Sequence, residues 1–400
     1  MKICFAELSG IRKTNDVDFT DTMSEFYKKG YADKLLLASN RSKDIIKKRI
    51  EDNPFLIEQI GINRMNHLKQ GTYFILSTKS EEFEKAQVLK NTFKNFSDAK
   101  KILDVYYDSF GLLVRNMTIL FSTGMWLVKD SNIQPKYIYL CTDVNNYIGV
   151  YDIKVDYSNS KGQNSQVDIT NDDIELCKKM VKLLYKPLLN IYHSENKAPS
   201  TIYINESRYF EVNRHLSTVN PSFTKALMLI QEARNTSFLA SKVDKYIAAL
   251  QCVFAVKDNF TFNCSRITSA YLGRNKKEDS EIIKFITIGY HIRSQLSHGK
   301  QVDEKKYDIE KTSNRLDSYM RRIMKKILSN DKLNYFTSED EIRVRKYFKD
   351  MAKEKFEADY NNLKRNNRVQ LIQNNIEAIK DLDTLMDIEE ILSKQINKVN

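Results

Sequence analysis

Glycine and proline are scarce in this chain, with 11 and 5 among 400 residues. Both residue types interrupt regular structure, so a chain that contains few of them favours long helices over tight hairpins. Hydrophobic residues make up 42% of the sequence, which is enough for buried cores and excludes a disordered chain. The length allows two or three domains of ordinary size. We therefore expect a folded protein with long helices and more than one domain.

The first 215 residues mix short β-rich runs with helical patterns. One helical pattern begins at Ser80, and another, Asp172–Tyr185, places its apolar residues on one face. Residues Ser158–Ser165 (SNSKGQNS) form a polar stretch that predicts a loop. The β-rich runs are Thr72–Ser77, Tyr137–Thr142, Ile148–Val155 and Thr201–Ile204. This half is predicted to be mixed α/β.

Residues 217–330 have helical periodicity almost throughout. The first helix is predicted to start at Asn220 and Pro221, which pair a capping side chain with proline at the first helical position. Gly299 is suited to end the fourth helix. The other four runs are Ser241–Ala255, Thr261–Leu272, Ser280–Ser297 and Asp303–Leu328. Periodicity alone therefore predicts an all-α bundle of about five helices.

Residues 338–395 are again helical in pattern, and Ser338 with Glu341 has the spacing of a capping box. This segment is either a solvated tail or an arm for oligomerisation or partner docking. The fold class is thus α+β, in three parts. These are a mixed α/β N-terminal domain (1–215), an all-α bundle (217–330) and a helical C-terminal extension (331–400).

Positive charge is concentrated in the predicted bundle. The chain has a net charge of +12, and residues 217–330 hold 20 Lys and Arg against 11 Asp and Glu, a net of +9. Such an excess favours a polyanionic partner such as RNA, DNA or an acidic membrane. A Lys-rich composition of the genome is the alternative explanation, but it predicts a more even spread along the chain.

Several classes of site and of location are not expected. The five cysteines have no C-x-x-C spacing, which indicates buried thiols in a reducing compartment and no zinc site or disulfide framework. No phosphate-binding or dinucleotide-binding glycine motif and no H-E-x-x-H zinc motif is present, so we expect no cofactor and no metal. There is no signal peptide pattern and no apolar run long enough to span a membrane, so we expect a cytoplasmic protein.

The segment Gly289–Lys300 (GYHIRSQLSHGK) holds the residues that indicate chemistry. Arg293 is followed by Ser294, four residues separate Arg293 from His298, and Gly299 follows the histidine. Tyr290 stands three residues before the arginine. This string, near the end of the fourth helix of a basic bundle, resembles the signature of HEPN domains of the Apea-like branch. The resemblance covers about residues 217–330.

The resemblance implies a metal-independent endoribonuclease, often a defence protein or a toxin, with Arg293, Ser294 and His298 in its site. RNA carries its own nucleophile, the 2′-hydroxyl, so cleavage needs proton transfer and stabilisation of charge on phosphorus. Histidine transfers protons near neutral pH, and arginine offers a charged fork that fits phosphoryl oxygens. The N-terminal half would then bind an unknown trigger.

Arg293 and His298 lie five residues apart, which places them about 140° apart around a regular helix. The resemblance implies that two such helices pair, so a homodimer with a composite site is expected. Tyr290 can reach the Arg293 face, whereas His291 is expected to point elsewhere. Glu232 and Asn235 on the first bundle helix lie where some HEPN domains place a polar residue facing the motif.

Other interpretations of the same residues stay open. Arg293 can be a surface ion-pair residue and His298 a helix cap, in a protein that binds RNA or dimerises without cleaving, or in a scaffold with a degenerate motif. Trp126, in the string GMWLVKDSN (124–132), is expected in the core. The candidates for contacts with RNA phosphates are Arg274, Lys276, Lys277, Arg321, Arg322, Lys325 and Lys326.

Overall fold

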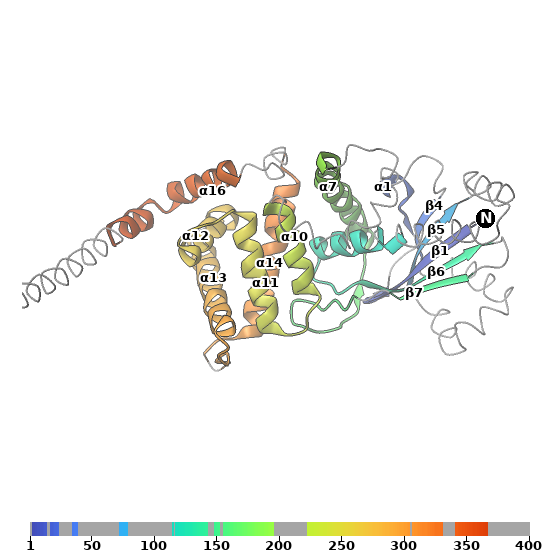
Figure 1. Cartoon of the computed structure of the whole chain (residues 1–400), viewed down its shortest axis with the longest axis horizontal. Helices are drawn as coiled ribbons and strands as arrows, with labels where there is room; N and C mark the ends of the chain where they lie inside the picture. Colours follow the sequence, from blue (N-terminus) through green and yellow to red (C-terminus); the bar gives the residue numbers. More distant parts are fainter. Residues whose placement is uncertain are drawn as a thin grey trace, which may run out of the picture.

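The computed structural model describes residues 2–13, 17–23, 34–38, 72–78, 114–115, 117–142, 148–152, 155–195, 222–304, 306–330 and 341–366. Within these ranges the chain is mostly helical, with a small sheet, and the fold is mixed α+β. The sheet lies at one end, the helical bundle lies in the middle, and the C-terminal helix extends from the far side of the bundle (Figure 1). No helix in the described ranges is both long and apolar enough to cross a membrane.

A six-stranded sheet forms the first part, with the strand order β3-β4-β5-β1-β6-β7. Every pairing in this sheet is antiparallel. The central strand, β1, pairs along almost its whole length with β5 on one side and β6 on the other. The strands are β1 (Lys2–Ser9), β3 (Val17–Asp18), β4 (Lys34–Ala38), β5 (Thr72–Thr78), β6 (Gln134–Thr142) and β7 (Ile148–Asp152). A separate parallel pair joins β2 (Ile11–Lys13) to β8 (Val167–Asp168).

Three of the four predicted β-rich runs are strands of this sheet, namely β5, β6 and β7. The fourth, Thr201–Ile204, and the helix expected from Ser80 lie outside the described residues. Strands β1 and β4 were not predicted. The polar stretch Ser158–Ser165 is a loop, as predicted.

A helical segment over residues 117–128, drawn in teal, links the sheet to the bundle (Figure 1). Its Phe121 contacts Phe19 and Phe74 of the sheet side, with ring centroids 5.5 and 5.6 Å apart. Helix α7 (Asn171–Glu195) packs closely against the same segment at Gly124. A Cβ at Gly124 would lie only 2.8 Å from Cγ2 of Val181, so the two helices need a glycine there.

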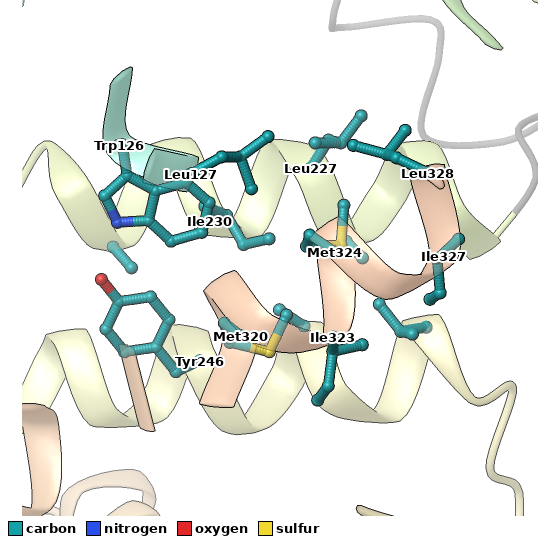
Figure 2. Packing of buried hydrophobic residues seen from close by; sticks show 14 of the residues in the cluster. Trp126, Leu127, Leu227, Ile230, Tyr246, Met320, Ile323, Met324, Ile327 and Leu328 are labelled. Atoms are coloured by element: carbon teal, nitrogen blue, oxygen red, sulfur yellow. The ribbon is translucent and has the colours of Figure 1, made fainter. Parts of the chain in front are cut away.

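Five helices form the bundle, at the positions that periodicity predicts. They are α10 (Ser222–Arg234), α11 (Leu239–Val253), α12 (Phe260–Leu272), α13 (Lys276–Ser297) and α14 (Ile309–Leu328). Helix α14 buries its apolar face, including Leu316, Met320 and Ile323, in the core of the bundle. Figure 2 shows this core, with Trp126 and Tyr246 at one end and Ile327 and Leu328 at the other.

Two helix starts, those of α13 and α14, lie four or more residues from their predicted positions because of capping side chains. Helix α13 begins at Lys276 rather than Ser280, since the side chain of Asn275 accepts a hydrogen bond from the backbone N–H of Glu278 (3.0 Å). Helix α14 begins at Ile309 rather than near Asp303, since Asp308 accepts from the N–H of Lys311 (2.9 Å). The four charged residues 276–279, which precede the predicted run Ser280–Ser297, are therefore the first turn of α13.

The described part of the C-terminal extension includes α16 (Glu341–Lys355), which packs on α12. Phe348 is fully buried against Phe254, with ring centroids 4.7 Å apart. Lys355 Nζ donates to Asp279 Oδ1 (2.7 Å) near the start of α13. The described part of this extension thus stabilises the bundle from outside.

Buried charged side chains join the bundle to the first part of the chain. Asp317 of α14 is 1% exposed and accepts hydrogen bonds from Trp126 Nε1 (2.8 Å) and Tyr246 Oη (2.7 Å). Arg234, also 1% exposed, donates to Ser122 Oγ (3.0 Å). The prediction that Trp126 is a core residue is confirmed. The predicted boundary at residues 215–217 lies outside the described ranges, and the hydrophobic core is continuous across it.

Candidate functional site at helix α13

The motif lies on the last two turns of α13 and the residues that follow it. The helix ends at Ser297, and His298 is its C-terminal cap. The backbone N–H of Lys300 bonds to Gln295 O (2.9 Å) and that of Gly299 to Leu296 O (3.1 Å), which together make a Schellman motif. Gly299 has φ +64, a left-handed conformation that glycine adopts without strain. The predicted role of Gly299 at the helix end is confirmed.

Arg293 is held by two side chains of α11. Its Nε forms an ion pair with Asp244 Oδ1 at 3.1 Å, and its Nη1 donates to Gln251 Oε1 at 2.9 Å. The Arg293 side chain is 30% exposed, so it is neither buried nor fully solvated. These contacts use two edges of the guanidinium, and Nη2 has no partner among the described residues. Arg293 is thus oriented by α11 and still reaches solvent.

Tyr290 lies one turn before Arg293 and contacts the same glutamine. Gln251 Nε2 donates to Tyr290 Oη (2.9 Å), which in turn donates to Cys264 Sγ (3.1 Å). Burial raises the pKa of Tyr290 well above its ordinary value, and the neighbouring Cys264 raises it further. Burial also raises the pKa of Cys264 to about 12. Both groups are neutral at neutral pH, so they orient Gln251 and Arg293 and do not supply a base.

His298 is exposed, and its imidazole has no hydrogen-bond or ion-pair partner in the part of the chain that the structure describes. The other histidine of the helix, His291, is also exposed and stacks on Tyr307, with ring centroids 6.1 Å apart. As expected, His291 does not share the contacts of Arg293. The imidazole of His298 is therefore accessible to a substrate, because no described residue of its own chain covers it or bonds to it.

An open pocket of about 580 Å³ lies beside Arg293, between α11, the start of α12 and α13. Four residues of α13 line it, at the spacing i, i+3, i+4 and i+7 that places side chains on one face of a helix. They are Tyr290, Arg293, Ser294 and Ser297. His298 does not line this pocket. The angular separation predicted for Arg293 and His298 is thus present in the structure. The other lining residues are Gln251, Asn259, Phe260, Thr261 and Phe262.

Glu232 and Asn235 contact residues other than the motif. Glu232 forms an ion pair with Lys245 (2.8 Å), and neither Glu232 nor Asn235 lines the pocket. Asn235 lies one residue beyond α10, where its side chain accepts from the backbone N–H of Asp156 (2.7 Å). The expectation that Asn235 lies on the first bundle helix is wrong, because α10 ends at Arg234.

The seven predicted RNA contacts fall into two groups. Arg274, Lys276 and Lys277 are exposed at the start of α13. Of the four on α14, Lys326 is exposed and the other three are half-buried. Arg321 forms an ion pair with the buried Asp317 at 2.7 Å. Burial lowers the pKa of Lys325, and so do the charges of the neighbouring arginines.

Arg322 and Lys326 stabilise the end of α12. Arg322 Nη2 donates to Leu272 O (3.0 Å) and forms an ion pair with Glu278 (2.9 Å). Lys326 Nζ donates to Tyr271 O (2.6 Å), and burial lowers its pKa. Cations suit the carbonyl end of a helix, since they offset its negative partial charge. These two side chains therefore have a structural role, whether or not they also contact a ligand. Replacing them would disturb the end of α12.

Sequence reasoning missed the two residues that hold Arg293. Asp244 and Gln251 lie seven residues apart, which places them on one face of α11, two turns apart. Two polar residues at that spacing on a helix of a bundle are the pattern that could have identified them. The pocket residues Asn259–Phe262 had no comparable signal, because their position depends on the turn between α11 and α12.

No group of three or more His, Cys, Asp or Glu side chains in the described ranges is placed to hold a metal ion. A scan against models of known protein families finds no match to this chain, and searches of curated proteins and of solved structures also find none.

Proposed function

We propose that the chain is a HEPN-type, metal-independent endoribonuclease whose site contains Arg293, Ser294 and His298. The observation that carries the proposal is the setting of Arg293. Two side chains of α11 hold it at a solvent-open pocket. An exposed histidine with no partner among the described residues follows at the end of the same helix. As the resemblance implies, the protein would act in the cytoplasm in defence or as a toxin, with the N-terminal half as the sensing part.

The chemistry assigned to each residue follows from its protonation and position. His298 removes the proton from the 2′-hydroxyl of RNA or protonates the departing 5′-oxygen, because imidazole exchanges protons near pH 7. Arg293 stabilises the negative charge that develops on the phosphoryl oxygens, and Ser294 donates a hydrogen bond beside it. The products are a 2′,3′-cyclic phosphate and a 5′-hydroxyl, and no atom of the protein is consumed.

Pairing of two chains belongs to the proposal because Arg293 and His298 point to different sides of α13. A second α13 packed against the first would bring the His298 of one chain toward the Arg293 of its partner. Light scattering of the purified protein should therefore give the mass of a dimer, and a monomer that is active would contradict the composite site.

The function is tested by incubating purified protein with RNA in EDTA. We expect cleavage by the natural sequence, and we expect His298→Ala and Arg293→Ala each to lower the rate by on the order of 10²-fold or more. His291→Ala is the matched control, since it removes an exposed imidazole from the same helix without touching the motif. Full activity of His298→Ala, or activity abolished by EDTA, would contradict the mechanism.

The alternative is a module that binds RNA, or dimerises, without cleaving. The ion pair between Arg293 and Asp244 favours it, because a carboxylate at 3.1 Å neutralises part of the charge that a phosphate would need. RNA binding that falls steeply with salt, with no cleavage product, would identify this alternative.

A further inference from the structure

The pocket beside Arg293 has unused hydrogen-bonding groups. Asn259 does not cap the helix that follows it, and the hydroxyls of Thr261, Ser294 and Ser297 have no hydrogen-bond partner in the described ranges. Several other hydroxyls of the bundle are hydrogen-bonded within the protein. Thr268 and Thr287, for example, donate to the carbonyl four residues before them, at 2.7 and 2.8 Å.

Two phenylalanines line the pocket, and Phe260 is the more exposed of the two. Phe262 is covered on one face by the guanidinium of Arg266, 4.4 Å from the ring centroid, and at its edge by Tyr360. Phe260 is 44% exposed and has no aromatic or cationic partner among the described residues. An apolar ring left open at a pocket is a platform on which a planar ligand can stack.

The charge and the size of the pocket further restrict the class of ligand that it can bind. Arg293 supplies a cation at one side, and its Nη2 is not used by the described part of the protein. The volume of about 580 Å³ lies within the range of small-ligand sites, which is about 300 to 1,000 Å³. The pocket thus offers partners for a planar ring, for a polar ring edge and for an anion. A nucleotide has all three, in its base and its phosphate.

We propose that this pocket binds one nucleotide, with its base stacked on Phe260, its edge bonded to Asn259 and Thr261, and its phosphate toward Arg293. The proposal rests on the proposed function, to which it adds a base-binding subsite next to the cleaved bond. The nucleotide comes either from a single RNA strand or from free solution.

Binding is measured with a labelled oligonucleotide of mixed sequence that carries 2′-deoxy sugars, which cannot be cleaved because it lacks the nucleophile. Phe260→Ala should weaken binding by about 10-fold, since stacking of one base contributes on this order. Phe260→Tyr should bind like the natural sequence, because the ring is kept. Phe238→Ala is the matched control, since Phe238 is 79% exposed and does not line the pocket.

Thr261→Val removes the hydroxyl and keeps the shape of the side chain, and it should weaken binding less than Phe260→Ala does. Competition with nucleoside 5′-monophosphates distinguishes the sources. Displacement of the oligonucleotide at micromolar concentrations assigns the pocket to a free nucleotide, and no displacement assigns it to a nucleotide within a strand.

The outcomes separate this proposal from the proposed function. Binding that depends on Phe260, in a protein that does not cleave RNA, would support the pocket and refute the nuclease. Cleavage that depends on His298 but not on Phe260, together with unchanged oligonucleotide binding by Phe260→Ala, would refute the pocket alone. A Phe238→Ala variant whose affinity falls as much as that of Phe260→Ala would also refute it.

Discussion

Arg293 has a structural role beside the chemical role that is proposed for it. Its contacts with Asp244 and Gln251 tie α13 to α11, and the same contacts fix the direction in which its remaining N–H groups point. An arginine fixed in this way loses little conformational entropy when an anion binds, because its rotamer is already selected. The Asp244 carboxylate also offsets part of the charge of Arg293. Asp244 can therefore favour anion binding by orienting Arg293 or oppose it by neutralising Arg293, and a measurement can tell which effect is larger.

Asp244→Ala should lower the rate of RNA cleavage on the order of 10-fold, because no carboxylate then orients Arg293. The variant should melt within a few degrees of the natural sequence, since an ion pair with 30% and 26% exposed side chains contributes at most about 1 kcal/mol. Glu232→Ala is the matched control, because it removes the carboxylate of a different ion pair, with Lys245. Cleavage rates and melting temperatures of the two variants decide the question. Equal cleavage rates would show that Asp244 does not position Arg293.

The sequence predicted which residues of α13 share a face better than it predicted what they contact. Tyr290 and Arg293 were expected on one face, and both line the pocket and contact Gln251. Helical periodicity gives the direction of a side chain relative to its own helix axis. It does not give the rotation of the neighbouring helix, so the partner Asp244 could not be identified in this way.

At the scale of elements, the five helices of the bundle were predicted because each carries its own apolar periodicity. The starts of α13 and α14 were misplaced where a single side chain, Asn275 or Asp308, decides the first turn. Strand β1 was missed although it lies at the centre of the sheet. Its sequence KICFAELS includes alanine, glutamate and lysine, which are poor strand formers, so its pairing with two neighbours outweighs its local preference.

The first turn of α13 carries two exposed lysines where a helix dipole would favour acidic residues. If both bind RNA phosphates, Lys276→Gln with Lys277→Gln should reduce the log–log slope of affinity against salt by about 0.7 for each phosphate that is no longer neutralised. The melting temperature should stay the same or rise slightly, since positive charge is removed from the positive end of a helix.

The control for this double variant is Lys179→Gln with Lys182→Gln, which removes two exposed lysines from α7. The measurement is the affinity for a labelled single-stranded oligonucleotide at several salt concentrations. A slope that falls equally in both double variants would show that only the overall charge of the protein matters, and an unchanged slope in both would remove Lys276 and Lys277 from the interface.

At the scale of the whole molecule, the first part of the chain and the bundle share buried polar contacts. Lys242 of α11 is 0% exposed, and its Nζ donates to Ala233 O (2.6 Å) and to Ser158 O (3.4 Å) in the loop before β8. Asp317 bonds to Trp126, which belongs to the helix that also packs on the sheet. If a trigger bound and moved that loop or helix, these buried contacts would transmit the movement to the bundle that carries Arg293.

The ionisation of Lys242 makes this junction sensitive to pH. Burial lowers the pKa of Lys242 to about 8, and the nearby Arg234 lowers it, while Asp317 and Asp130 oppose the shift. The unfolded chain holds this proton more tightly than the folded protein does, so the contribution of Lys242 to the free energy of unfolding rises with pH through the window from about 8 to 10.5. A variant that lacks the amine, Lys242→Met, has no such dependence.

The free energy of unfolding of the natural sequence, minus that of Lys242→Met, should therefore increase by about 2 kcal/mol between pH 7 and pH 9.5. Denaturant titrations at several pH values measure it, and taking the difference removes the titration of groups common to both proteins. Lys245→Met, three residues along the same helix, is the matched control for the removal of a lysine, because its amine pairs with Glu232 at the surface. A difference for Lys242→Met that stays constant with pH would mean that Lys242 keeps its proton in the folded protein throughout this range, so the junction would hold a permanent buried cation instead of a titrating one.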